Sequence, residues 1–464
     1  MSPRGATLAV LNTVSLMIVL DSTIVAVAIP AIQRDLGFSP AGVAWVINGY
    51  LVAFGGLLLL AGRLGDLLGA RRVFLSGLAL FTLASLLCGF AGNAELLIAG
   101  RFLQGAGGAF ASAVILGMIV RLYPSPGPQA RAMGIFSFTQ AGGAAIGFVA
   151  GGVLTDLAGW PAIFLINVPI GVGAFLAGLR LLPQTPGSGV RGGLDVPGAL
   201  LITAGLSAGV YAIVDGVPLI GAVAVLLLIA FLVRQKYASS PLVPLRLLRR
   251  PWLLAANGAV LLIVAAGLGF QFVNTLFLQE IMGFDALRTG LAFLPTPVMI
   301  GLVSLFAAAR LTARFGPRPV LLGGLLLLAG GLLALSRLPD APSYPLHVLP
   351  ALTVMGAGIG VALPAVMMLS MAGASEEDTG LVSGLNNTAQ QAGMALGLAV
   401  LAAASAARTS DRLSRGATEV TALGDGYSLA FLLAAAFVAA ALLVAVTALR
   451  HPPVVAAPSK VSAL

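Results

Sequence analysis

The sequence predicts an all-α integral membrane protein with 14 transmembrane helices, arranged as two six-helix bundles plus two extra central helices. Of its 464 residues, 59% are hydrophobic and only 9% are charged, whereas about 25% are charged in an ordinary soluble domain. The apolar runs are continuous and about 20 residues long, which is the length of a helix that crosses a bilayer. A membrane β-barrel would instead show segments of about 10 residues with alternating polarity.

The composition also excludes several other classes of protein. A disordered chain would need low hydrophobicity, and a disulfide scaffold would need more than the single cysteine, Cys88. The net charge of +9 does not indicate nucleic-acid binding. The 25 cations are arginines except for Lys236 and Lys460, and they stand singly or in short groups between apolar runs, not along one basic face.

Fourteen apolar segments account for the predicted helices. Connections as short as residues 89–95 and 156–161 force neighbouring helices to run antiparallel. The first segment contains Asp21 and leads to no cleavage site, so we expect a retained helix and not a signal peptide. The segments are residues 6–31, 42–62, 73–92, 94–120, 132–156, 161–182, 194–214, 217–233, 252–279, 288–309, 318–336, 346–371, 380–406 and 427–449.

The cationic residues predict the orientation in the membrane. With the N-terminus inside, 18 of the 25 Lys and Arg residues fall in cytoplasmic segments, six fall outside, and Arg101 lies within a span. Because cytoplasmic loops are enriched in Lys and Arg, both termini are expected on the cytoplasmic side, as an even number of spans requires. Asp215 and Glu280 are then expected at the outer ends of spans, in interfacial positions.

An internal repeat divides the chain into two halves. Residues 62–71 resemble residues 309–318 at an offset of 247, and residues 36–38 resemble residues 282–284 at an offset of 246. Parallel repeats of six helices are typical of transporters whose site lies between the halves. The expected divisions are an N-terminal six-helix bundle at 1–190, two additional helices and a linker at 191–240, and a C-terminal six-helix bundle with a short cytoplasmic tail at 241–464.

A series of short motifs follows the predicted helices in order. They are residues 20–30 in the first helix, 62–72 in the first cytoplasmic loop, 98–105 in the fourth helix, and 159–160 with 164–169 at the entry to the sixth. These stretches resemble the major facilitator superfamily, and more narrowly its fourteen-span drug:proton antiporter branch. The fifth helix departs from that branch, which usually has Gly-Pro where this chain reads Gly147-Phe148. The resemblance covers nearly the whole chain and implies the major facilitator fold.

The resemblance also implies a function. It implies a proton-coupled antiporter in the cytoplasmic (inner) membrane of a bacterium, exporting lipophilic small molecules or drugs by alternating access. Its partners would be that substrate, protons and membrane lipid, with no nucleic acid, and the chain would act as a monomer. A substrate-specific proton-coupled symporter for a small metabolite is the alternative. We expect no enzyme activity, cofactor or metal, because the sequence has neither clustered His, Asp or Glu nor a phosphate-binding glycine-rich loop ending in Lys.

Two charged residues lie deep within predicted spans. Asp21 is roughly 15 Å from the outer end of its helix, and Arg101 is roughly 10 Å from the outer end of the fourth, at 1.5 Å per residue. A carboxylate at such depth is costly, so we expect Asp21 to face a polar cavity or a partner and to bind a proton or a cationic substrate. The resemblance puts both helices on one cavity wall and implies that Arg101 takes part in proton handling. The alternative is a structural ion pair without transport chemistry.

Further polar side chains near mid-span are expected to line the cavity. Their alternative role is hydrogen bonding between helices, worth about 0.6–2 kcal/mol each. The expected substrate-binding set is Asp21, Asn48, Tyr50, Gln104, Asn167, Gln271, Asn274, Asn387 and Gln391.

The loop at residues 62–72 is expected to be part of a gate. The resemblance implies that Asp66 docks at the N-terminus of the thirteenth helix, where a helix dipole stabilises an anion. Arg71 and Arg72 could meet the acids at 376–378, just before that helix. Glycines of the fifth helix permit close packing or a hinge. The expected gating set is Gly62, Arg63, Asp66, Gly69, Arg71, Arg72, Gly147, Gly151 and Gly152. The alternative for the charges is that they only set the topology.

Overall fold

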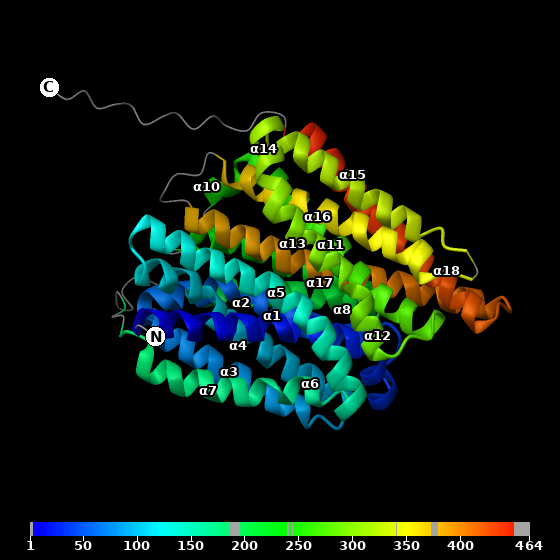
Figure 1. Cartoon of the computed structure of the whole chain (residues 1–464), viewed down its shortest axis with the longest axis horizontal. Helices are drawn as coiled ribbons and strands as arrows, with labels where there is room; N and C mark the ends of the chain where they lie inside the picture. The colour runs from blue at the N-terminus through cyan, green and yellow to red at the C-terminus, as the bar shows by residue number, and fades with distance from the viewer. Residues whose placement is uncertain are drawn as a thin grey trace.

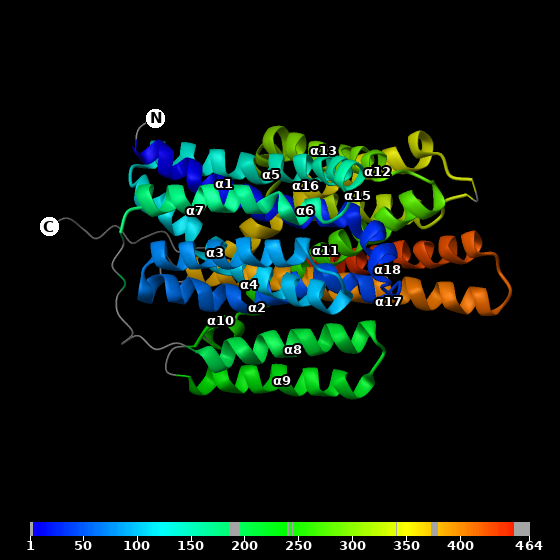
Figure 2. The same cartoon turned by 90° about the horizontal axis from the view of Figure 1, so that it is seen from below.

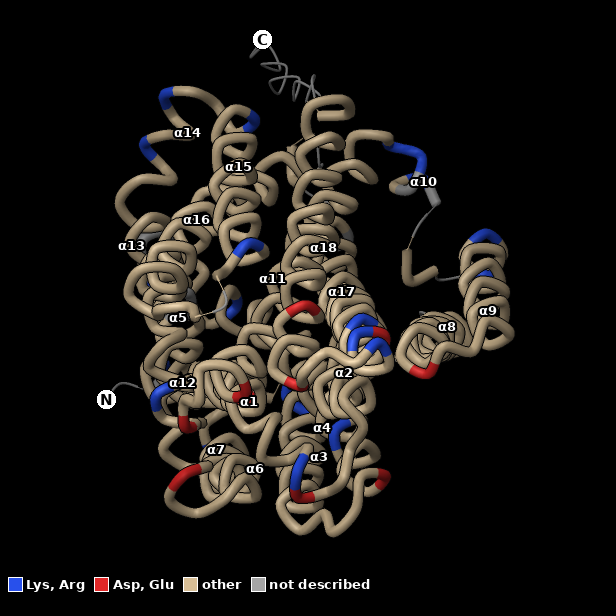
Figure 3. Tube along the Cα trace, turned by 90° about the vertical axis from the view of Figure 1, so that its right-hand side faces the viewer, with Lys and Arg blue, Asp and Glu red and all other residues tan. Residues whose placement is uncertain are grey.

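The computed structural model describes residues 3–184, 187, 195–238, 241–243, 245–339, 341–372 and 379–449. Within these ranges the chain is built of helices, and 14 of the described spans are long and apolar enough to cross a membrane. The predicted all-α membrane fold is therefore confirmed. The long helices lie side by side (Figures 1 and 2). Each span contains an 18-residue stretch with at most two charged residues, and most of the trace in Figure 3 is uncharged.

The N-terminal half forms six spans. A cap at the start of the fourth span shows how the sequence positions it: the side chain of Asn93 accepts a hydrogen bond of 2.8 Å from the backbone of Leu96, which satisfies a free N–H group of the first turn. The elements are α1 (Pro3–Leu36), the short 3-10 helix η1 (Gly42–Ala44), α2 (Trp45–Leu68), α3 (Ala70–Gly89), α4 (Ala94–Leu122), α5 (Pro126–Ala158), and α6 (Ala162–Leu165) followed by α7 (Asn167–Leu181).

The middle of the chain adds two spans and the C-terminal half six more. Several spans of this half contain a π-helical turn, labelled η3, η4 or η5. The elements are α8 (Val196–Val214), α9 (Pro218–Tyr237), the short α10 (Leu245–Leu248), α11 (Pro251–Leu276) with η3 (Phe277–Ile281), the span made of α12 (Ala286–Phe293), α13 (Pro295–Val303), η4 (Ser304–Ala308) and α14 (Ala309–Phe315), then α15 (Pro317–Leu335), η5 (Tyr344–Val348) with α16 (Leu349–Met371), α17 (Thr379–Ser414) and α18 (Glu419–Thr447).

Several helices extend well past the apolar segments that predict them. Helix α1 has 34 residues, and a helix of that length spans about 50 Å at 1.5 Å per residue, more than the roughly 30 Å hydrocarbon core of a bilayer. Its last turn contains Arg34. Hydropathy detects only the part of a helix that lies in lipid, so the polar ends fall outside the predicted limits.

The sequence repeat is also a repeat of backbone conformation. Gly69 and Gly316, related by the offset of 247, both have a positive φ, at 96° and 82°. Gly37 and Gly283, related by the offset of 246, both have a φ of 67°. A residue with a Cβ rarely adopts this conformation, so glycine fixes the same turn at the same place in each half.

The two halves meet through equivalent helices. In the first half, α1 packs on α5 and α3 packs on α4; in the second, α11 packs on α17 and α15 packs on α16. Between the halves, α2 packs on α17 and α5 packs on α12. Because α2 corresponds to the span that begins with α12, and α5 to α17, the two interfaces are related by the repeat.

The two additional spans form a hairpin on one side of this assembly. Helix α8 packs against both α2 and α17, and α9 packs against α8 (Figure 2). The hairpin therefore covers the seam where the two halves meet. Asp195 links the two ends of this hairpin. Its carboxylate accepts hydrogen bonds from Arg234 Nε at 2.9 Å and from Gln235 Nε2 at 2.6 Å, so the start of α8 is bonded to the end of α9.

Candidate functional site

A buried ion pair lies inside the N-terminal half. Asp21 of α1 and Arg101 of α4 are 0% and 1% exposed, and Arg101 Nη1 lies 2.6 Å from Asp21 Oδ2. The other carboxylate oxygen, Asp21 Oδ1, accepts hydrogen bonds from Gln104 Nε2 at 2.7 Å and from Asn167 Nδ2 at 2.9 Å. Helices α1, α4 and α7 thus each supply part of one site. Three donors therefore surround the Asp21 carboxylate.

Arg101 is held by more than its acid. Its Nε donates to the backbone carbonyl of Val46 at 2.8 Å, and its Nη1 also donates to Gln104 Oε1 at 2.6 Å. Its guanidinium lies 4.6 Å from the centroid of the Tyr50 ring and 5.7 Å from that of Phe164, within the range of cation–π attraction. Arg101 therefore has several partners besides Asp21.

Gln104 connects the parts of this site. Its amide nitrogen donates both to Asp21 and to the hydroxyl of Ser85 on α3, at 2.7 Å, while its amide oxygen accepts from Arg101. Ser85, Val46 and Phe164 are not among the predicted site residues. A serine within an apolar helix is the one weak signal that could have indicated Ser85. A backbone carbonyl such as that of Val46 leaves no signal in a sequence.

The network determines what this site can do chemically. Burying a charged pair is costly unless good geometry and further hydrogen bonds satisfy both groups, and removing one partner then strands the other charge. Asp21 is the carboxylate of this site, and the described structure seals it from solvent. Proton exchange requires another arrangement of the helices.

Comparisons with known proteins identify the family. A sequence profile of the Major Facilitator Superfamily matches residues 11–398. The chain belongs to this superfamily. It is 38% identical over 452 residues to the puromycin resistance protein pur8 of Streptomyces alboniger, covering 94% of this chain and 88% of that protein. It is 36% identical over 413 residues to the cephamycin export protein CmcT of Amycolatopsis lactamdurans, covering 86% and 84%.

Solved structures show the same fold. A bacterial homologue of the human lysosomal transporter Spinster, in an inward-facing and occupied conformation, matches with a TM-score of 0.71 at 15% identity, covering 97% of each chain. A mutant form of the nucleoside transporter NupG matches with a TM-score of 0.67 at 11% identity, covering 96% of this chain and 100% of that one. At these identities the likeness concerns the fold alone.

The structure of this superfamily member brings some predicted substrate-binding residues to Asp21 and not others. Gln104 and Asn167 contact Asp21, and Tyr50 contacts Arg101. Asn48 and Asn274 are fully buried, and their side-chain amides have no hydrogen-bond partner among the described residues. The other three lie apart from the ion pair: Gln271 is half-buried on α11, Asn387 is exposed on α17, and Gln391 packs against Gly55 where α2 meets α17.

The predicted gating loop makes contacts within its own half. Gly69 ends α2 with a positive φ, and Arg71 Nη2 donates to the carbonyl of Leu179 in the last turns of α7. Arg72 is exposed, and a Cβ on Gly62 would meet open space. Arg63 and Asp66 lie in and near the last turn of α2. The acids at 376–378, expected to meet Arg71 and Arg72, lie outside the described residues.

The glycines of α5 serve two different contacts. A Cβ on Gly147 would lie 1.8 Å from Thr23 Oγ1, and one on Gly151 would lie 2.9 Å from the carbonyl of Ile24, so both face α1. A Cβ on Gly152 would instead lie 2.6 Å from the carbonyl of Ala286 in α12 of the other half. The glycine stripe therefore joins α1 to α5 and α5 to the second half.

Hydrogen bonds and ring stacking also join the two halves on the predicted outer side, which is the side of the molecule away from the N-terminus. Asp156 Oδ2 accepts a hydrogen bond of 2.9 Å from the backbone of Leu287, and Gln279 Nε2 donates to the carbonyl of Val27 at 3.0 Å. The rings of Phe148 and Phe293 stack with centroids 4.9 Å apart. These contacts join the halves on this side in the described arrangement and must separate if the halves move apart there.

Proposed function

We propose that this chain is a proton-coupled antiporter that exports lipophilic small molecules by alternating access, with Asp21 as the proton-binding carboxylate. The observation that supports it most is the fully buried Asp21–Arg101 pair inside a membrane-spanning bundle, since ionisable groups at such depth are rarely structural. Export is supported by relatives named for antibiotic resistance or export. We further propose that the chain acts as a monomer in the inner membrane of a bacterium, with both termini cytoplasmic.

The proton would act by changing the charge of the pair. Protonation of Asp21 removes its attraction to Arg101, while Arg101 stays held by Val46, Gln104 and Tyr50. The change therefore falls mainly on α1, whose attachment to α4 is weakened while the hydrogen bond from Gln104 remains. In this scheme a substrate that binds near Asp21 favours loss of the proton, and proton binding favours loss of the substrate. Competition of this kind couples two fluxes in opposite directions.

A path of close contacts could transmit that shift between the halves. Thr23 lies two residues after Asp21 on α1 and faces Gly147 of α5. On the same helix α5, Gly152 faces Ala286 of α12, and Asp156 bonds to the backbone of Leu287. We propose that movement of α1 is passed through α5 to α12, so that the protonation state of Asp21 biases the outer contacts of the two halves.

The test is transport in proteoliposomes under an imposed pH gradient, with puromycin as the probe because a relative is named for resistance to it. Wild type is expected to move puromycin against the direction of proton flow, and Asp21→Asn to move none above the level of empty liposomes. Glu95→Gln, an exposed acid in the first turn of α4, is the matched control and should keep wild-type transport.

Two outcomes would contradict the proposal. Accumulation of the probe in the same direction as the protons would favour the symporter alternative. Gradient-driven transport by Asp21→Asn at the wild-type rate would exclude Asp21 as the coupling group.

A further inference from the structure

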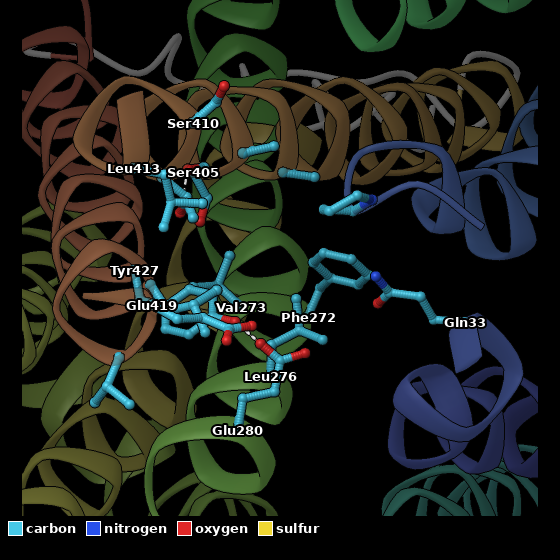
Figure 4. A pocket seen from close by; sticks show the side chains of 16 residues that line it. Gln33, Phe272, Val273, Leu276, Glu280, Ser405, Ser410, Leu413, Glu419 and Tyr427 are labelled. Atoms are coloured by element: carbon cyan, nitrogen blue, oxygen red, sulfur yellow. Dashed lines mark hydrogen bonds between the residues drawn. The ribbon is translucent and has the colours of Figure 1, made fainter. Parts of the chain in front are cut away.

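A cavity lies away from the ion pair. It has a volume of about 630 Å³ and is bordered mainly by α11 with η3, α17 and α18 of the C-terminal half, while Gln33 and Pro40 close it from the N-terminal half. Figure 4 shows Gln33 across the cavity from the side chains of α17 and α18. Gln33 lies in the last turn of α1 and Pro40 follows that helix, so the cavity is on the predicted outer side. Its volume is typical of sites for drug-sized molecules, about 300–1,000 Å³.

The wall of this cavity is largely apolar with a few hydroxyl groups. Leu413 of α17 and Val420 of α18 are exposed and supply apolar surface, and Ser410 supplies an exposed hydroxyl. Figure 4 shows Ser405, Ser410 and Leu413 at one end of the cavity and Phe272 between that end and Gln33. A broad apolar wall with few polar groups is the usual composition of a site for a lipophilic ligand.

Two carboxylates border the same cavity. Glu280 lies in the π-helical turn η3, and Glu419 lies in the first turn of α18. Tyr427 of α18 donates a hydrogen bond to Glu280 (Figure 4). Among the described residues, no Lys or Arg nitrogen lies within 4.0 Å of either carboxylate. Both side chains are exposed, and π-helical turns occur frequently at functional sites.

The position of an acid at the start of a helix accounts for Glu419 but not for Glu280. An acid in the first turn is stabilised by the helix dipole, but that effect does not apply to Glu280, which follows the end of α11 where the dipole favours a cation. Glu280 therefore lies in an unfavourable place on its own helix and faces the cavity that holds a second acid. A ligand with a positive charge would offset both carboxylates.

We propose that this cavity is a second ligand site, which binds an organic cation with an apolar body. The charge would lie at Glu280 and Glu419, and the apolar body would contact Leu413 and Val420. The site is independent of the Asp21–Arg101 pair, because that pair is sealed inside the other half. Binding alone tests the proposal, so it does not depend on proton coupling.

The experiment measures the binding of tetraphenylphosphonium to the purified full chain by equilibrium dialysis. Asp21→Asn is used as the background, because it removes the other candidate site for a cation. In that background, binding is expected to persist, and Glu280→Gln with Glu419→Gln is expected to raise Kd about tenfold, as for loss of about 1.4 kcal/mol. Glu95→Gln, an exposed acid on the same predicted side, should leave Kd unchanged.

A neutral probe separates charge from shape. Triphenylphosphine oxide has a similar apolar body without the charge, so its binding should not respond to the two glutamate substitutions. Ala406→Trp, which places a large ring in the wall of the cavity, should block both probes. If the double variant does not elute as a monodisperse protein, Glu419→Gln alone is used and should raise Kd about threefold, since one of two charges is lost.

Two results would overturn the proposal. One is an unchanged Kd for tetraphenylphosphonium when both glutamates are replaced. The other is loss of all tetraphenylphosphonium binding in Asp21→Asn, which would assign the cation to the ion pair alone. Failure of proton-coupled transport with binding retained at the cavity would contradict the antiporter proposal and leave this one intact.

Discussion

The two halves of the molecule share a backbone plan but differ in where they hold charge. In the N-terminal half, Asp21 and Arg101 form a sealed pair whose polar atoms have partners. In the C-terminal half, the offset of 246 that relates Gly37 to Gly283 assigns Gly267 to the place of Asp21. The acids of that half that border a cavity, Glu280 and Glu419, lie at helix ends. The repeat therefore keeps turns and packing, while the position of the buried carboxylate in one half is a glycine in the other.

The difference shows that helix packing and site chemistry are separately determined. Gly69 and Gly316 fix the same turn in both halves because both need a positive φ. A deep carboxylate, by contrast, is tolerated only where neighbouring helices supply donors. In the first half, α4 and α7 supply them through Arg101, Gln104 and Asn167. Asn274 of α11 has no such neighbour among the described residues.

The largest expected effect comes from breaking the sealed pair. Arg101→Met leaves the buried Asp21 without its cation and should lower the free energy of unfolding by about 3–5 kcal/mol. Thermal unfolding in detergent measures this. Adding Asp21→Asn to Arg101→Met removes the stranded charge and should recover part of the loss. A double variant no more stable than Arg101→Met would show that the pair is not the source of the effect.

A smaller effect is expected from the contact between α1 and α5. Gly147→Ala places a Cβ 1.8 Å from Thr23 Oγ1 and should destabilise the protein by about 1–3 kcal/mol, the usual cost of overpacking. Gly267→Ala is the matched control in the second half, because a Cβ there meets nothing within 4 Å. It should be neutral or stabilising by up to about 1 kcal/mol, since alanine favours helix more than glycine. Equal destabilisation by both substitutions would remove the distinction between the two positions.

The last prediction compares the stability changes caused by replacing two buried amides, Asn167 and Asn274. Asn167→Leu removes a donor to Asp21 and should cost about 1–3 kcal/mol, as for a buried group left without a partner. Asn274→Leu removes a buried amide that has no partner among the described residues, so it should be neutral or should stabilise the protein by up to about 1–3 kcal/mol. If Asn274 binds substrate, as the sequence predicts, the same variant should instead raise KM for transport. A large loss of stability in Asn274→Leu would mean that its amide is satisfied in the folded protein.

Much of this arrangement could be predicted from the sequence, for identifiable reasons. Apolar runs report lipid burial directly, so they predict the 14 spans, although not their polar ends. Asp21 and Arg101 are conspicuous because charges inside apolar segments are rare, and their motifs match a family that the comparisons confirm.

The remainder depends on contacts between distant segments. Ser85, whose one weak signal is that it is a serine in an apolar helix, and the Val46 carbonyl, which leaves no signal, complete the ion-pair site. Glu280 is predicted to be interfacial, and sequence alone could not indicate that Glu419, 139 residues later, borders the same cavity. The packing of α11, α17 and α18 brings these two acids to the same cavity. The periodicity of a local sequence segment does not predict that packing.

The central claim is that Asp21 exchanges the proton that is coupled to export. The most direct measurement is substrate-driven proton movement in proteoliposomes that contain a trapped pH indicator and no imposed gradient. Addition of puromycin should produce a pH change with wild type and with Glu95→Gln, and none with Asp21→Asn at equal protein content. A pH change of wild-type size with Asp21→Asn would contradict the claim.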